Sequence, residues 1–89
     1  MIYFTAIRLS GGSQHHHITR LRWRNPATGE TSENSRSELV HWIKKEGGDA
    51  RVKDAYGDVQ VAVVDANPPY LRTIADGRYT DNLLSLPTF

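Results

Sequence analysis

Two segments near the start of the chain carry the pattern of β-strands. Residues 2–9 are rich in Tyr, Phe, Thr and Ile, side chains that favour a pleated surface. Residues 18–24 alternate between apolar or small side chains and arginines, and successive side chains of a strand point to opposite faces. Trp23 should therefore face away from the arginines on either side of it. Glycines at 11 and 12 predict a turn between the two strands.

The clearest helical pattern covers residues 36–46. Ser35 and Glu38 have the spacing of a capping box, in which each side chain accepts a hydrogen bond from the other residue's backbone N–H. Apolar residues then recur at spacings of three and four, and two lysines occupy the last turn, where the helix dipole favours cations. The pair Gly47-Gly48 follows as a C-terminal cap. These signals agree with one another and fix both ends of the helix.

The second half of the chain predicts a hairpin and then an irregular segment. Residues 50–54 and 59–65 read as two strands joined by a turn that contains glycine. Residues 30–33 offer a short additional strand before the helix. Residues 70–89 mix apolar and polar side chains without a clear period, although Asp76-Gly77 marks a tight turn. We expect this last segment to be irregular and held to the body by its leucine and isoleucine side chains.

The predicted fold is α+β, with two layers in which one helix packs on a mostly antiparallel sheet of four or five strands. The order is β-β-α-β-β, with residues 70–89 as an irregular C-terminal segment of one domain spanning residues 1–89. A length of 89 residues gives room for one core and one shallow site. The expected core residues are Leu9, Leu21, Trp23, Leu39, Ile43, Val61 and Val63.

Composition narrows the possible classes of protein. The chain has no cysteine, which excludes thiolate zinc sites and cysteine nucleophiles and fits a reducing compartment. No segment has the pattern of a signal peptide, and no apolar run is long enough to cross a bilayer. We therefore expect a cytoplasmic protein, monomeric or homodimeric, with no membrane partner.

Charge is almost balanced overall but unevenly distributed. The net charge is +1, with a surplus of basic residues in the first half and of acidic residues in the second. The uneven distribution fits either a basic binding face or two halves that pair with each other. A stripe of arginines on one strand could follow a nucleic-acid backbone. A pI near 8.1 and the opposite orientation of Trp23 favour a solvated, ion-paired face instead. The stripe consists of Arg20, Arg22 and Arg24.

Motifs at the two ends of the chain carry a family resemblance. Residues 6–12 (AIRLSGG), the His-X-His-Ile of residues 15–18 and Arg22-Trp23 lie in the first third. Residues 70–73 (YLRT), Asp76-Gly77 and residues 81–84 (DNLL) lie near the end. Together they resemble the small proteins of bacteria and phages grouped as domain of unknown function 3892, over nearly the whole chain. The resemblance implies a shared fold and a shared site, and it supplies no activity.

The histidines and the Gly-Gly turn offer several kinds of chemistry. On an extended chain His15 and His17 would share one face, where they could supply two ligands to a metal or hydrogen bonds to a bound molecule. They could equally be polar loop residues at the start of a strand. Backbone N–H groups of Gly11-Gly12 could form an anion-binding nest, although a plain connecting turn explains them as well. No nucleophile elbow or phosphate-loop motif is present.

The carboxylates near the end of the chain also allow two interpretations. Asp76 and Asp81, with Asn82, could form a catalytic acid–base pair. They could instead stabilise turns through hydrogen bonds to their own backbone, which is the interpretation we favour.

The resulting functional hypothesis is a small non-enzymatic binding module of phage or bacterial accessory type. Its partner would be a host protein or a small anionic ligand resembling a nucleotide, with no cofactor, no resident metal and no catalytic residue. The alternatives are nucleic-acid binding through the arginine stripe and a metal-dependent hydrolase that uses His15 and His17. The predicted ligand-binding residues combine the two ends of the chain: Ser10, Gly11, Gly12, His15, His17, Arg72, Asp76, Gly77, Asp81 and Asn82.

Overall fold

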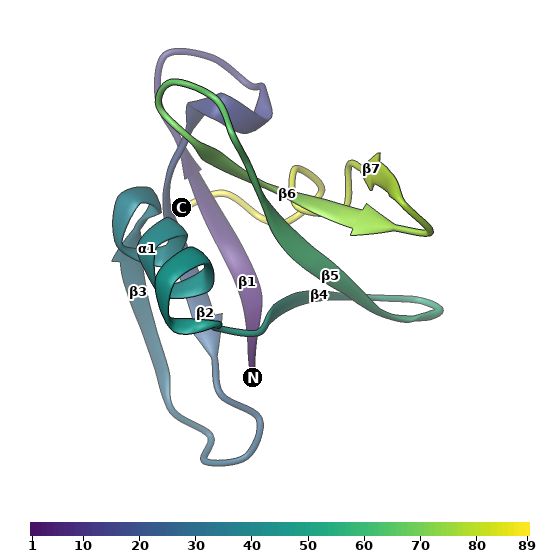
Figure 1. Ribbon diagram of the computed structural model, residues 1–89. Helices are drawn as coiled ribbons and strands as arrows, with labels where there is room; N and C mark the ends of the chain where they lie inside the picture. Colours follow the sequence, from purple (N-terminus) through teal and green to yellow (C-terminus); the bar gives the residue numbers. More distant parts are fainter.

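A single sheet of seven strands dominates the computed structural model, which describes residues 1–89 (Figure 1). Its spatial order is β3-β2-β1-β4-β5-β6-β7, and all neighbours are antiparallel except β1 and β4. The elements in chain order are β1 (Ile2–Leu9), the 3₁₀ turn η1 (His15–His17), β2 (Ile18–Arg24), β3 (Thr31–Ser35), α1 (Arg36–Glu46), β4 (Ala50–Asp54), β5 (Gly57–Val64), β6 (Tyr70–Ala75) and β7 (Arg78–Thr80).

The helix links two antiparallel meanders and explains the one parallel pair. Strands β1, β2 and β3 follow one another as neighbours, so β3 runs in the direction of β1. Helix α1 then carries the chain back across β2 and β1 to β4, which pairs with β1 in parallel. A parallel neighbour requires such a crossover connection, because a tight turn reverses the chain direction.

The edge of β1 away from β2 is shared between two partners. β4 pairs with its first residues only, through Ile2 with Ala50 and Tyr3 with Arg51. Further along, the Ile7 N–H donates to the Pro87 carbonyl at 2.9 Å, and the Phe89 N–H donates to the Ile7 carbonyl at 3.0 Å. The C-terminal residues therefore occupy the part of this edge that β4 leaves open.

The helix and four of the predicted strands are confirmed. Strands at 2–9 and 18–24 have the expected bounds, and the predicted hairpin is β4 and β5. The Ser35 hydroxyl accepts from the Glu38 N–H, the Glu38 carboxylate accepts from the Ser35 N–H, and Gly47 ends the helix with a positive φ of 67°. These features depend on residues close together in the chain, which is why the sequence located them.

The predicted fold class is wrong, because it contains too few strands and gives the helix too large a share. The structure is mostly sheet, with seven strands in one mixed sheet and one short helix, instead of a helix layered on four or five strands. The order is β-β-β-α-β-β-β-β, because β3 pairs along five residues and residues 70–80 form two further strands. No helix has the length and apolar character needed to cross a membrane.

The segment expected to be irregular begins as a β-hairpin. Leu71 and Thr73 are both buried with 2% and 0% exposure, so the inward face of β6 includes a polar residue. The Thr73 hydroxyl donates to the Thr80 carbonyl at 3.0 Å and accepts from the Thr80 hydroxyl at 2.6 Å, which makes its burial possible. This buried threonine interrupts the apolar alternation, so the pattern did not predict a strand.

One hydrophobic core joins strands, helix and C-terminal segment. Of the predicted core residues, Leu21, Leu39 and Val61 are buried, and the other four are partly buried against the core. Leu83, in the turns after β7, is fully buried with 0% exposure. The buried apolar residues of this core are Ile2, Phe4, Ile7, Ile18, Leu21, Leu39, Val40, Ala50, Val52, Val61, Leu71 and Leu83.

Candidate functional site

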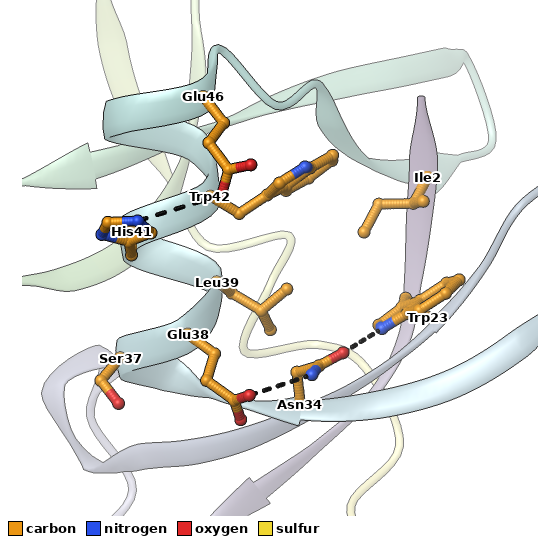
Figure 2. Close-up of a pocket in the computed structure, with 9 residues that line it drawn as sticks. All are labelled: Ile2, Trp23, Asn34, Ser37, Glu38, Leu39, His41, Trp42 and Glu46. Carbon is orange, nitrogen blue, oxygen red and sulfur yellow. Dashed lines mark hydrogen bonds and ion pairs between the residues drawn. The ribbon is translucent and has the colours of Figure 1, made fainter.

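The largest hollow of the molecule is a cleft between α1 and strands β1 to β3, with a volume of about 660 Å³. We call it the tryptophan cleft, because both tryptophans of the chain line it. Figure 2 shows Trp42 on the helix and Trp23 on β2 on two sides of the cleft, with Leu39 and Ile2 between them. Its complete lining is Ile2, Trp23, Asn34, Ser37, Glu38, Leu39, His41, Trp42 and Glu46.

Both indole rings have defined neighbours. The Trp23 Nε1–H donates to the Asn34 Oδ1 at 2.8 Å across the β2–β3 pair (Figure 2). The Trp42 ring lies against Gly48, where an added Cβ would overlap the ring atoms. The cleft is therefore lined by two indole rings, of which that of Trp23 is oriented by a hydrogen bond.

The charged side chains around the cleft are acidic or histidine. Glu38 accepts hydrogen bonds from the Ser35 backbone and hydroxyl, and these bonds lower the pKa of its carboxyl. Glu46 lies near His41, with 3.9 Å between Oε2 and Nε2. No lysine or arginine lines the cleft. A bound ligand would thus meet apolar rings and negative charge.

Three of the residues predicted from the sequence meet at a second place. The Arg72 guanidinium donates to the Asp81 Oδ1 at 2.9 Å, and the same oxygen lies 3.9 Å from the His15 Nε2. His15 is buried at 6% exposure, and its Nε2 has no hydrogen-bond partner. The two ends of the chain therefore do come together, but none of the predicted ligand-binding residues lines a hollow of the surface.

The environment of His15 favours its neutral form. Burial lowers the pKa of His15, and the nearby positive charge of Arg72 lowers it further. The Asp81 carboxylate acts in the opposite direction, and His16 adds a smaller lowering effect. Folding therefore opposes protonation of this side chain.

We expect the free energy of unfolding to decrease as the pH falls below about 6.5, the usual pKa of histidine. Because the pKa of His15 is lower in the folded chain, the unfolded chain binds the proton first, and stability decreases towards the folded pKa. The pKa values of Glu38 and Asp49 are also lowered in the folded chain, and these two groups reduce the free energy of unfolding mainly below about pH 4.5. Urea denaturation at several pH values between about 7 and 5 measures the effect.

His15→Leu should make stability nearly independent of pH in this window, because it removes the buried titrating group. The control is His41→Gln, at a residue whose side chain is 66% exposed, which should keep the wild-type pH dependence. If the free energy of unfolding changed with pH equally in the wild type and in His15→Leu, this account would be contradicted.

The remaining predicted site residues are dispersed. Gly12 lies against the His17 ring, and the His17 Nδ1 accepts from the Gln14 N–H at 3.0 Å. Asn82 donates to the Asp54 carboxylate at 3.2 Å. Ser10 donates its backbone N–H to the His17 carbonyl, which closes the loop that contains Gly11. These contacts give the residues structural roles in turns and loops.

Asp76 and Gly77 form the tip of the β6–β7 hairpin. Their φ values of 53° and 75° are those of a two-residue turn with left-handed residues, for which Asp-Gly is a preferred sequence. The expected extended path through the histidines is also wrong, since residues 15–17 form a 3₁₀ turn. His15 is buried and His17 is half-buried against the Gly12 turn, so the two do not form a common ligand-binding face. No group of three or more His, Asp or Glu side chains is arranged to hold a metal.

The arginine stripe is partly neutralised by contacts within the protein. Arg20 and Arg22 both approach Glu33, at 3.7 and 3.6 Å. The Arg22 guanidinium also lies 4.1 Å from the centre of the Phe89 ring. Arg24 makes no ion pair. Nucleic-acid binding through this face stays a prediction.

The cleft itself was not predicted from the sequence. Trp23 and Trp42 were both assigned to apolar faces, and they are separated by 18 intervening residues in the chain. A signal was present, because tryptophan is rarely buried completely, so two tryptophans on elements that pack together are expected to leave part of their rings exposed. In the sequence, Gly48 indicates only the end of the helix, whereas in the structure its missing side chain makes room for the Trp42 ring.

The sheet, its single helix and the cleft between them define a small β-rich domain. Residues 3–87 match the family described as "Protein of unknown function (DUF3892)", and the chain belongs to this family. The resemblance seen in the end motifs is thereby confirmed. No curated protein and no solved structure matches the chain.

Proposed function

We propose that the protein is a non-enzymatic binding module that holds a small organic ligand with a flat ring in the tryptophan cleft. The observation that supports this proposal is the pair of indole rings on two sides of a hollow of about 660 Å³. Small-molecule sites have volumes of roughly 300–1,000 Å³ and are lined mainly by apolar and aromatic side chains with a few polar groups.

Two polar side chains of the cleft, those of Glu38 and Asn34, already have internal partners, which favours binding over catalysis by these two groups. Around the cleft, Glu38 is engaged in capping the helix, and Asn34 is engaged with Trp23. Asn34 also donates to Glu38, at 3.5 Å. Polar groups with fixed internal partners can orient a ligand, whereas acid–base catalysis needs a free pair directed at a reacting atom. A protein partner that inserts a flat side chain into the same cleft is the alternative, and it would use the same contacts.

The test is a titration with indole, a neutral flat probe, followed by nuclear magnetic resonance. The chain has two tryptophans, so two indole N–H signals report directly on the two sides of the cleft. We expect both signals to shift and saturate together. Trp42→Ala should abolish the saturable shift of the Trp23 signal, because one wall of the cleft is removed.

The matched control is Tyr56→Ala, since Tyr56 is 99% exposed at the β4–β5 turn and does not line the cleft. This variant should bind indole as the wild type does. A preserved backbone amide spectrum identifies variants that remain folded. The proposal fails if indole leaves both tryptophan signals unchanged, or if Trp42→Ala binds as well as Tyr56→Ala.

A further inference from the structure

We infer that the ligand of the tryptophan cleft carries a positively charged nitrogen next to its flat ring, bound by the Glu46 carboxylate and the tryptophan faces. The inference rests on the proposed function and adds the charge of the ligand to it. It differs from the anionic ligand expected from the sequence, because the hollow lies elsewhere and has the opposite charge.

One carboxylate of the cleft, that of Glu46, has no hydrogen-bond donor within the protein. Glu38 Oε1 accepts from the Ser35 N–H at 3.0 Å and from its hydroxyl at 2.9 Å, so this group already has donors. Glu46 accepts no hydrogen bond, and its Oε2 lies 3.9 Å from the Nε2 of the His41 ring. Both of these side chains are more than half exposed, at 61% and 66%. Glu46 can therefore turn to a ligand cation at little cost.

The Glu46 carboxylate lies at the same end of the cleft as the Trp42 indole. Glu46 and Trp42 are four residues apart on α1, and residues at this spacing are neighbours on a helix surface. Figure 2 shows both at the same end of the cleft. Tryptophan is the aromatic side chain that attracts cations most strongly over its face. A carboxylate beside an indole is thus a combined site for an ammonium or guanidinium group.

Helix α1 carries its basic side chains and its acidic side chains beside different hollows. Its basic residues Arg36, Lys44 and Lys45 line a different, smaller hollow of about 230 Å³ beside Pro68 and Pro69. None of these three lines the tryptophan cleft. An anionic group would be attracted to the basic side of α1, and a cationic group to the side that carries Glu46.

The experiment compares three probes that share the indole ring system and differ in charge. They are tryptamine, which is cationic, indole, which is neutral, and indole-3-acetate, which is anionic. We expect tryptamine to bind about tenfold more tightly than indole-3-acetate at low salt. An exposed ion pair and a cation–π contact each contribute a factor of about three to this ratio. Glu46→Gln should reduce this ratio to about threefold, because the contact with the indole face remains. Removing a negative charge from the C-terminal turn of a helix should not destabilise the fold.

Glu30→Gln is the matched control, because Glu30 is exposed outside the cleft and should leave the ratio unchanged. Equal affinities for the three probes would overturn the inference and leave the proposed function standing. Tighter binding of indole-3-acetate would likewise overturn it. If none of the probes shifts the tryptophan signals, both the proposed function and the inference are wrong.

Discussion

Leu83→Ala should lower the free energy of unfolding by about 2–5 kcal/mol, the range found for leucine-to-alanine changes in well-packed cores. Leu83 follows the last strand and has 0% exposure, so truncation would leave a cavity under the C-terminal segment. The Ile7–Pro87 and Phe89–Ile7 hydrogen bonds hold this segment to β1 and prevent it from collapsing freely into the cavity. Urea denaturation monitored by circular dichroism measures the loss.

Thr88→Ala is the control for Leu83→Ala. Thr88 bridges Ile7 through its backbone, and its side chain is exposed, so its removal should change stability by less than about 0.5 kcal/mol. A loss of similar size in both variants would mean that the loss does not come from the cavity at Leu83. An unchanged stability for Leu83→Ala would mean that the segment is not part of the core.

Gly48→Ala should lower stability by about 1–3 kcal/mol, the usual cost of overpacking. The new Cβ would overlap the Trp42 ring, and the ring is the group that can move. Its displacement should change the Trp42 indole N–H signal and weaken the binding of indole to the tryptophan cleft. The same nuclear magnetic resonance titration measures both effects.

Gly12→Ala is a matched control for Gly48→Ala, because its Cβ would overlap the His17 ring in a similar way outside the cleft. It should lose comparable stability and keep the Trp42 signal and the affinity for indole. Equal loss of binding in the two variants would show that binding follows stability and does not depend on the position of Trp42.

The sequence predicted features that depend on neighbours along the chain. The helix from Arg36 to Glu46, with its Ser35 cap and Gly47 end, follows from a capping box and a C-terminal glycine. The Asp76-Gly77 turn was also predicted, although the strands on either side of it were missed. Those strands depend on the burial of Thr73, which the carbonyl and the hydroxyl of Thr80 make acceptable through two hydrogen bonds.

The arrangement of the site could be predicted only in part. Polar residues at both ends of the chain suggested that these ends meet, and His15, Arg72 and Asp81 do so. The sequence did not show that they would pack without leaving a hollow. The cleft depends on the angle at which α1 crosses the sheet, which results from many distant contacts and leaves no local pattern in the chain.

The shared edge of β1 has a consequence for how the chain acquires its structure during synthesis. β1 is synthesised before its partners on one edge, which are residues 50–51 and 87–89. The open half of that edge stays unpaired until the last of these residues has been made, so the nascent chain exposes a template for pairing with other strands. Completion of the sheet is therefore a late event, and truncated chains that lack residues 87–89 should aggregate more readily than the full chain.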